Sequence, residues 1–327
     1  RDLIRLRGPH ENIVGATSGG LLSLSNNQLD ILSDNFNNLD LSVVGLDSKG
    51  LIWVAGSYPN ANIQVFDSAY NLIYNSDYLV DQGVESITEF SFHSSKVFVA
   101  SSTSEDVRVL EFNYNQNIPE YVEFYNNFPQ QINSIYDIDL YNNNIYLTTD
   151  IGILKSDFIE EDLKRPSSWS QPVYYTNNEN ILFFHRNDFG SYLITESHLW
   201  LDSDGTTDIL DLDSYPFDIQ KQPNLDFFCT QNSCYEINQN STNLIYSIND
   251  TYEINNYFKI NNQLFFAVKN GGIASLDLEN PLNQSHFIPN TLLQNKYDAI
   301  TLLENGFLAG ISETNGFIYD GNKFNYF

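Results

Sequence analysis

Basic residues are scarce in this sequence of 327 residues. It has 15 lysines and arginines against 42 aspartates and glutamates, so the formal net charge is −27. A protein that binds nucleic acid needs lysine and arginine to displace counterions from phosphate, and an anionic membrane surface makes the same demand. The net charge therefore argues against nucleic acid and anionic membranes as partners. An acidic surface favours solubility, function at high salt or the binding of cations.

Long apolar runs and methionine are also missing. No stretch approaches the ~18 apolar residues of a membrane span, so we expect no membrane insertion. The sequence contains no methionine, begins with Arg1 and shows no signal peptide. We therefore expect that the true start was removed or lies upstream, as in a processed exported protein or a shortened chain.

Cysteine occurs twice, as Cys229 and Cys234 in "CTQNSC". The four residues between them suit a hairpin loop with a cross-strand disulfide at its neck, which would imply an oxidising compartment. The alternative is a pair of reduced thiols, one of them buried.

Catalytic signatures are absent as well. There is no H-E-x-x-H, G-x-S-x-G, P-loop or G-x-G-x-x-G motif, and the five histidines show no metal-binding spacing. The many acidic residues provide no carboxylate pair that stands out. We therefore predict no catalytic residue, and we expect a binding protein rather than an enzyme.

The sequence is rich in aromatic residues, at 14%, with 21 tyrosines and 23 phenylalanines. This composition, with many asparagines, favours strands and polar turns over helices. A hairpin pattern such as "LIWVAGSYPNANIQVFD" at 51–67 recurs along the chain, and each copy has a small residue after a bulky one. The small residues are Ala16, Ala55, Ala100, Thr148, Thr195, Cys229, Ala267 and Gly310.

The small residue recurs about every 42 residues, which is the period of four-stranded propeller blades. Shorter strand patterns flank each hairpin, so each unit holds roughly four strands. These eight small residues, which we call the small column, are expected on the second strand of each unit, buried between neighbouring sheets. We predict an all-β fold, a single β-propeller domain over residues 1–327. Eight blades are favoured, and seven are the alternative if the N-terminal segment joins the last unit to close the ring.

The units "LIWVAGS…NIQVFD", "NIYLTTDIGILKSD", "SHLWLDSDGTTDIL" and "LFFAVKNGGIASLDL" resemble two-component-regulator-type propeller repeats, which carry an "LWxGT…GLxxxD"-like hairpin. The chain departs from this motif, because tryptophan appears in only two hairpins, at Trp53 and Trp200, and the Gly-Thr pair is usually replaced. The resemblance implies an extracytoplasmic address, since such propellers occur in sensor domains of hybrid histidine kinases. They also occur in exported and surface bacterial proteins, including type IX secretion accessories.

Three stretches contain candidate site residues. The turn "DSDGTTD" places Asp202, Asp204 and Asp208 close together, as in calcium loops, although a hairpin needs Asp-Gly there anyway. The stretch "FFHRND" puts His185 and Arg186 on a strand expected near the central channel, where they could meet an anionic ligand or act in acid/base chemistry. Tyr174 and Tyr175 are candidates for stacking on sugar rings.

The stretch "GILKSDFIEEDLKRPSSWSQP" at 152–172 resembles an Asp-box hairpin of sialidase-like propellers, lengthened by an acidic insertion. In those proteins the box is structural. We therefore expect Asp157 and Trp169 to clip the outer hairpin together.

These observations predict a non-enzymatic, extracytoplasmic binding or scaffold module. Its partner would be a protein or a glycan, held at the channel mouth or the loop face. No cofactor is expected apart from calcium. The alternatives are a carbohydrate-active propeller enzyme, a lyase or hydrolase, and the ligand-sensing domain of a larger receptor.

Overall fold

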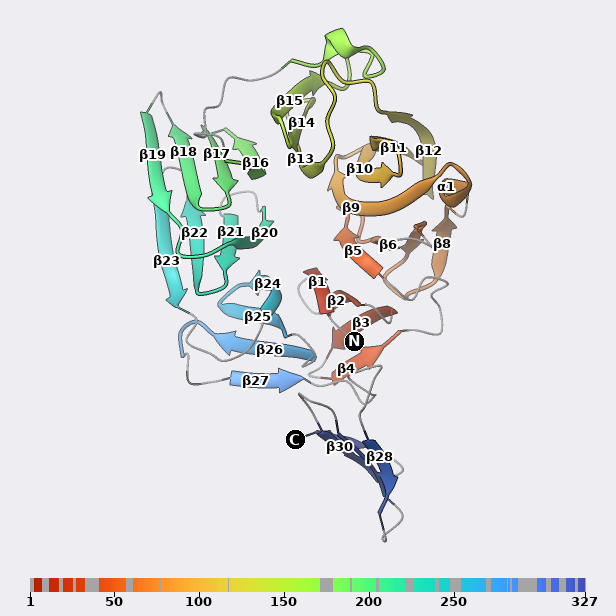
Figure 1. Cartoon of the computed structure of the whole chain (residues 1–327), viewed down its shortest axis with the longest axis vertical. Coiled ribbons are helices and arrows are strands. Elements are labelled where there is room, and N and C mark those ends of the chain that lie inside the picture. Colours follow the sequence, from red (N-terminus) through yellow and green to blue (C-terminus); the bar gives the residue numbers. More distant parts are fainter. Residues whose placement is uncertain are drawn as a thin grey trace.

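The computed structural model describes residues 3–7, 12–17, 20–25, 28–32, 41–56, 61–76, 78–116, 118–170, 179–188, 190–203, 206–221, 226–238, 241–247, 254–268, 272–280, 282, 284–287, 299–303, 307–311, 316–320 and 323–326. The chain folds into eight antiparallel sheets, each made of strands that follow one another in the sequence (Figure 1). This arrangement confirms the predicted β-propeller fold.

The first four sheets are as follows. Sheet 1 holds β1 (Leu3–Arg7), β2 (Asn12–Thr17), β3 (Gly20–Ser25) and β4 (Gln28–Ile31). Sheet 2 holds β5 (Leu41–Leu46), β6 (Ile52–Gly56), β7 (Ile63–Phe66) and β8 (Leu72–Asn75), and is followed by the short helix α1 (Tyr78–Asp81). Sheet 3 holds β9 (Val84–Phe92), β10 (Lys96–Thr103), β11 (Val107–Asn115) and β12 (Ile118–Tyr125). Sheet 4 holds β13 (Ile135–Tyr141), β14 (Asn144–Thr149) and β15 (Gly152–Asp157).

The other four sheets continue the series. Sheet 5 holds β16 (Ile181–Asn187), β17 (Gly190–Thr195), β18 (His198–Ser203) and β19 (Thr206–Asp211). Sheet 6 holds β20 (Pro216–Gln220), β21 (Asp226–Thr230), β22 (Ser233–Asn238) and β23 (Ser241–Ser247). Sheet 7 holds β24 (Ile254–Ile260), β25 (Gln263–Val268), β26 (Gly272–Asp277) and β27 (Gln284–Phe287). Sheet 8 holds β28 (Ala299–Leu302), β29 (Leu308–Ile311), β30 (Gly316–Tyr319) and β31 (Phe324–Tyr326).

Sheets 1 to 7 surround a central channel, with the first strand of each sheet innermost (Figure 1). The ring closes where β1 lies beside β24 and β25 of sheet 7. Among the described residues the buried apolar side chains form seven clusters, and each cluster lies between two neighbouring sheets of the ring. The core is thus a circle of sheet-to-sheet contacts, which leaves the channel free for other side chains.

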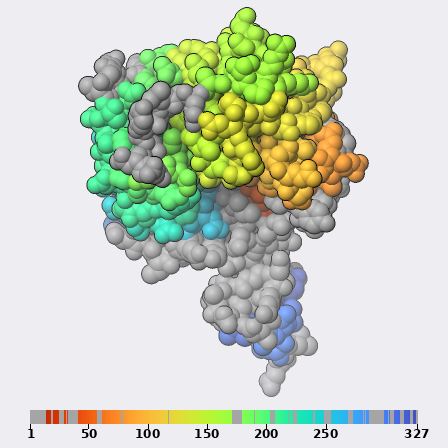
Figure 2. Space-filling view, turned by 45° about the horizontal axis from the view of Figure 1, so that its top comes forward, coloured from red at the N-terminus to blue at the C-terminus, as the bar shows by residue number. Residues whose placement is uncertain are grey.

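Sheet 8 lies outside this ring (Figure 1), and it projects from the rounded body of the molecule in Figure 2. All eight predicted units therefore form sheets, but seven of them make up the ring. The ring closes because sheet 1, a complete sheet from the N-terminal segment, lies beside sheet 7. The predicted alternative, a partial N-terminal blade that joins the last unit, is not what the structure shows. That residues 1–327 form a single domain stays a prediction.

The small column lies on the second strand of every sheet, as predicted, and all eight of its residues are buried. A side chain no larger than threonine or cysteine there lets neighbouring sheets approach closely, while bulky residues beside it fill the space between them. At Gly310 an added Cβ would lie 2.2 Å from the Phe317 ring, so glycine is required at that position.

Sheet 4 has three strands among its described residues, where four were predicted. The acidic insertion follows β15. The end of the insertion pairs with β15 through a single antiparallel β-bridge between Lys155 and Ser170. Trp169 is buried there, its indole N–H donates to the Leu163 carbonyl at 2.9 Å, and its ring packs on Phe128. The Asp157 carboxylate accepts two main-chain N–H groups of the following turn. Both residues therefore fasten the outer hairpin, as expected.

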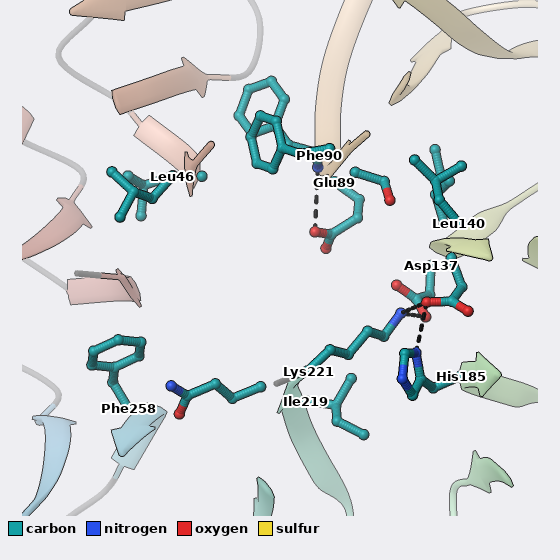
Figure 3. Close-up of a pocket in the computed structure, with 16 residues that line it drawn as sticks. Leu46, Glu89, Phe90, Asp137, Leu140, His185, Ile219, Lys221 and Phe258 are labelled. Carbon is teal, nitrogen blue, oxygen red and sulfur yellow. Dashed lines mark hydrogen bonds and ion pairs between the residues drawn. The ribbon is translucent and has the colours of Figure 1, made fainter. Parts of the chain in front are cut away.

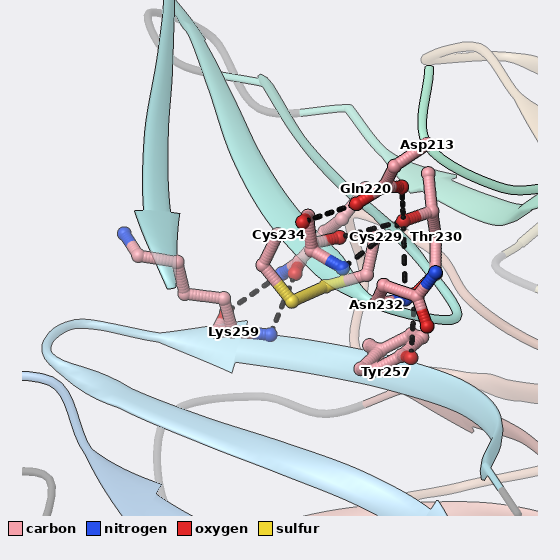
Figure 4. Close-up of a disulfide and its surroundings, with 9 residues drawn as sticks. Asp213, Gln220, Cys229, Thr230, Asn232, Cys234, Tyr257 and Lys259 are labelled. Atoms are coloured by element: carbon pink, nitrogen blue, oxygen red, sulfur yellow. Dashed lines mark hydrogen bonds between the residues drawn. A yellow bond between two sulfur atoms is a disulfide. The ribbon is translucent and has the colours of Figure 1, made fainter. Parts of the chain in front are cut away.

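The two cysteines form a disulfide that joins β21 to β22, where they face each other across the hairpin (Figure 4). Both are buried between sheets 6 and 7. Beside them Tyr257 donates to the Thr230 carbonyl at 2.7 Å, and Thr230 and Ser233 donate to the Asp213 carboxylate. The hairpin neck is thus held by the disulfide that the sequence predicts, and also by a polar network that the sequence did not indicate.

Gln64 on β7 is a polar residue in the core between sheets 1 and 2. It is 1% exposed, and neither atom of its side-chain amide has a hydrogen-bond partner among the described residues. Because an unpaired buried amide costs about 1–3 kcal/mol, we expect Gln64→Leu to raise the free energy of unfolding by about 1–2 kcal/mol. Urea unfolding followed by far-UV circular dichroism measures this. Gln64→Glu is the control and is expected to destabilise, and a less stable Gln64→Leu protein would contradict the assignment.

Candidate functional site

A cavity of about 420 Å³ occupies the central channel. Among the described residues its lining comes from the innermost strands β5, β9, β13, β16, β20 and β24, together with Lys221 directly after β20. Its size falls within the usual range for small-ligand pockets. The lining residues include Leu46, Glu89, Phe90, Phe92, Asp137, Asp139, His185, Gln220, Lys221 and Phe258.

One side of the cavity carries charged side chains, which we call the charged wall: Glu89, Asp137, Asp139, His185 and Lys221 (Figure 3). The Lys221 ammonium lies 2.8 Å from Asp137 Oδ2 and 3.2 Å from Asp139 Oδ1. His185 Nδ1 lies 2.9 Å from Asp139 Oδ1. The charged wall therefore joins side chains from sheets 3, 4 and 5 and from the end of β20 in sheet 6.

Side chains alternate between the two faces of strand β13, and this alternation brings two carboxylates together at the cavity. In "IYDIDLY" Asp137 and Asp139 stand two residues apart, so both side chains point to the same face of the strand. Each accepts a main-chain N–H group of β16: Phe184 donates to Asp137 Oδ2 at 3.3 Å, and Arg186 donates to Asp139 Oδ2 at 3.1 Å. The two aspartates thus bind sheet 4 to sheet 5 and hold His185 in place.

Burial and charge act differently on the two carboxyl groups. Burial raises the pKa of Asp137 to about 6, and the nearby Glu89 adds to this, although Lys221 opposes it. Burial also opposes ionisation of Asp139, but Lys221, His185 and the Arg186 N–H outweigh it and lower its pKa. The physical reason is that two carboxylates share one ammonium, so the first proton is taken up at Asp137.

The lining also contains apolar side chains, which are called here the apolar wall: Leu46, Phe90, Phe92 and Phe258. In Figure 3 Leu46 and Phe258 lie across the cavity from Asp137, and Phe90 lies beside Glu89. The rings of Phe90 and Phe92 stack with their centroids 6.1 Å apart. Both meet the edge of Trp53, which is fully buried behind them. A ligand in this cavity therefore meets both carboxylates and aromatic rings.

The structure separates the two residues of the predicted cationic pair. His185 is half-buried and lines the cavity, as expected for a residue near the channel. Arg186 is exposed and takes part in the charged wall through its main-chain N–H. Their adjacency on a strand explains this, because successive side chains point to opposite faces. Tyr174 and Tyr175 lie outside the described residues, and all four ligand-binding assignments stay predictions.

The predicted calcium turn is described in part. Asp202 on β18 and Asp208 on β19 are both exposed, and Asp204 lies outside the described residues. Over the part of the chain that the structure describes, no group of three or more histidine, cysteine or acidic residues is arranged to hold a metal ion.

Calcium binding at this turn stays a prediction that thermal unfolding can test. Because a ligand that binds only the folded state stabilises it, millimolar calcium is expected to raise the melting temperature if the turn is a site, and Asp204→Ala is expected to abolish the rise. Asp81→Ala, which removes an exposed aspartate elsewhere, is the control. A rise that persists in Asp204→Ala would contradict the site.

Sequence reasoning missed most of the charged wall: Glu89, Asp137, Asp139 and Lys221. A signal was present, because "SIYDIDLY" at 134–141 places two aspartates on an otherwise apolar strand that was expected to be innermost. A buried acidic residue needs a cation or hydrogen bonds. The sequence did not indicate which cation supplies them, since Lys221 is 84 residues away from Asp137.

No helix among the described residues is long and apolar enough to cross a membrane. No protein-family model and no curated protein matches the chain.

Several solved structures resemble it. PorZ, a bacterial surface component of the type IX secretion system of Porphyromonas gingivalis, is 13% identical with a TM-score of 0.71. That match covers 100% of this chain and 46% of PorZ, so the chain spans about half the length of that protein.

Two further bacterial proteins are similar. The extracellular domain of the putative one component system BT4673 from B. thetaiotaomicron is 12% identical, with a TM-score of 0.54, and the match covers 99% of this chain and 52% of that one. BamB from Moraxella catarrhalis is 11% identical, with a TM-score of 0.51 and coverage of 94% and 90%. At these identities the likeness shows the fold: the chain is a β-propeller whose structural neighbours include bacterial surface and extracellular proteins.

Proposed function

We propose that this protein is an extracytoplasmic binding module that holds a protein or glycan partner at the mouth of its central channel. The observation that carries the proposal is the channel cavity, which has a charged wall and an apolar wall at the centre of the ring. Concave sites with a few placed polar groups on an apolar background are the usual form of ligand sites.

Two further observations support the extracytoplasmic part of the proposal. The disulfide between Cys229 and Cys234 is a type of bond that persists in oxidising compartments. Among the structural neighbours, PorZ is a surface component and the BT4673 domain is extracellular. The BT4673 likeness also agrees with a ligand-sensing domain of a larger receptor, which would use the same binding site.

The experiment is a binding screen with a blocked channel. The full chain is immobilised and exposed to a glycan array and to envelope proteins, and each hit is remeasured with Ser91→Trp, which places an indole in the cavity lining. Val122→Trp on the outer strand β12 is the matched control, because Val122 is exposed and lies outside that lining. We expect Ser91→Trp to abolish binding and Val122→Trp to leave it unchanged. Partners that bind both variants equally would refute a channel site.

A carbohydrate-active enzyme is the second candidate, and one observation favours it. Asp137 lies in the cavity with a pKa raised to about 6 by burial, which is the property of a general acid in glycoside cleavage. Incubation of the chain with each glycan hit, followed by mass spectrometry, tests for turnover. Cleavage that is lost in Asp137→Asn would establish the enzyme, and intact glycans would leave the binding module.

A further inference from the structure

A second cavity, of about 470 Å³, lies where sheet 3 is joined to sheet 4. The turn between β10 and β11 lines one part of it, and the connection from β12 to β13 lines the other. This cavity lies at the end of sheet 3 where β9 begins, because Thr103 of the turn pairs with Val84. Residues 89–92, near the other end of β9, line the channel cavity. The two cavities therefore lie toward opposite faces of the ring.

Neutral polar side chains are prominent in the lining of this second cavity, which we call the polar cavity. The connection contributes five exposed residues with side-chain amides: Asn126, Asn127, Gln130, Gln131 and Asn133. The turn adds the hydroxyl groups of Ser102, Thr103 and Ser104. Because amides and hydroxyl groups both donate and accept hydrogen bonds, the polar cavity suits a ligand that does both.

Three of these asparagines are held through their amide nitrogens. Asn126 donates to the Asp106 carboxylate at 2.6 Å, and Asn127 donates to a main-chain carbonyl at 3.2 Å. Asn133 donates to the Asp150 carboxylate at 2.8 Å. Since the nitrogen is the donor in each of these contacts, the amide oxygen is left to accept a hydrogen bond from a ligand hydroxyl group.

The Asp106 carboxylate in the lining is already bound by donors of the protein. Thr103 Oγ1 donates to Asp106 Oδ1 at 2.7 Å, and Arg108 Nε donates to the same oxygen at 2.8 Å. Burial opposes ionisation of Asp106, but hydrogen bonds from Asn126, Thr103 and Arg108 outweigh it and lower its pKa. Asp106 therefore stays ionised, with Arg108 compensating its charge. Glu105, the other acidic lining residue, is exposed to water.

The polar cavity also has buried apolar side chains in its lining: Val107, Phe128 and Ile132. The Phe128 ring is fixed by an edge contact with Trp169, with the ring centroids 5.2 Å apart. A ligand in the polar cavity thus meets apolar groups below and amide groups around the rim. A sugar ring has the same division, with C–H groups on its faces and hydroxyl groups around its edge.

We infer that the polar cavity binds a neutral sugar unit, with a C–H face against Phe128 and Ile132 and its hydroxyl groups on the surrounding amides. An anionic ligand would find no lysine or arginine among the described lining residues, and a cation would find Asp106 already paired. The volume of about 470 Å³ falls within the usual range for small-ligand pockets. This inference goes beyond the proposed function, because it adds a second site toward the face opposite the channel cavity.

The test compares neutral sugars with charged analogues of the same ring. Saturation-transfer NMR of the full chain uses the methyl glycosides of glucose, galactose, mannose and N-acetylglucosamine, and a glycan array presents the same units in chains. We expect at least one neutral unit to bind, and the uronic acid and amino sugar of the same configuration to bind at least about fivefold more weakly. Binding of the free glycoside identifies a free sugar as sufficient, and binding on the array alone identifies a unit within a glycan.

Two variants place the sugar in the polar cavity. Gln131→Trp introduces an indole at an exposed position of the lining and is expected to abolish binding. Asn127→Ala removes one amide oxygen and is expected to weaken binding about three- to tenfold. Asn115→Ala is the matched control with no expected effect, because Asn115 is an exposed asparagine whose amide donates to Glu120 at the other end of sheet 3. Failure of every neutral sugar to bind, or unchanged binding in Gln131→Trp, would overturn the inference.

Ser91→Trp separates this site from the channel. A sugar held in the polar cavity is expected to bind Ser91→Trp as tightly as the native chain, whereas a partner held in the channel is expected to be lost. A sugar that is lost in Ser91→Trp and kept in Gln131→Trp would support the proposed function and contradict this inference. A sugar that is lost in Gln131→Trp alone would support the inference and leave the channel to be judged by its own partners.

Discussion

Replacing Lys221 by methionine is expected to lower the free energy of unfolding by about 3–5 kcal/mol at pH 8. The substitution leaves the two buried carboxylates, Asp137 and Asp139, without the ammonium that lies 2.8 and 3.2 Å from them. Removing one partner of a buried ion pair has this effect because the remaining charge stays desolvated. Urea unfolding followed by far-UV circular dichroism measures the change.

The loss is expected to shrink as the pH falls. In the native protein the raised pKa of Asp137 means that its ionised form is disfavoured on folding, so its contribution to stability decreases as the pH rises from about 4 to about 6. The lowered pKa of Asp139 has the opposite sign, and the stability that it contributes is lost in acid. Without Lys221 both groups take up protons more readily, so the deficit is largest above pH 7 and smallest near pH 5.

Two comparisons make this prediction specific. Lys259→Met removes a comparably buried lysine whose partner, Glu236, is more accessible to water, so a smaller and nearly pH-independent loss is expected. Adding Asp137→Asn to Lys221→Met removes one of the two carboxylates that the first substitution leaves without an ammonium partner. The double variant is therefore expected to recover part of the lost stability. Equal losses for Lys221→Met at pH 5 and pH 8 would show that the ammonium contributes packing and no charge compensation.

Replacing Trp53 by alanine is expected to destabilise the protein by about 4–5 kcal/mol, the upper part of the range for buried aromatic residues. Trp53 is fully buried between sheets 2 and 3, where four aromatic rings meet its indole: Phe90, Phe92, Phe112 and Tyr114. Its N–H also donates to the buried Asp47 carboxylate at 3.1 Å. The substitution leaves a large cavity and removes one donor from a buried acceptor.

Trp200 is the control, because it is a tryptophan on β18, the third strand of sheet 5, that is less deeply buried than Trp53. It is half-buried, and its indole N–H has no hydrogen-bond partner among the described residues. Trp200→Ala is therefore expected to cost about 1–2 kcal/mol. Since Phe90 and Phe92 line the channel cavity and rest on Trp53, Trp53→Ala is also expected to weaken the binding of a partner that Ser91→Trp excludes from the channel. Equal destabilisation by the two substitutions would contradict the packing described for Trp53.

Much of the fold follows from the repeat in the sequence. A small residue after a bulky one, about every 42 residues, specifies which strand lies second in each sheet, because only a small side chain lets two sheets approach closely there. The spacing of Cys229 and Cys234 predicted the disulfide. The apolar run before His185 predicted that this residue lies on an innermost strand, where it lines the cavity. These features are local, so the chain around each residue was enough to predict them.

The tertiary structure decided what depends on closing the ring. The unit around Gly310 carries the same pattern as the other seven, yet it lies outside, because β1 occupies the place beside sheet 7. The charged wall likewise brings Lys221 to an aspartate 84 residues earlier, and the sheet geometry turns His185 inward and leaves Arg186 exposed. Local sequence specifies each sheet, but which side chains meet in the channel depends on the number of sheets and on their rotation about a common axis.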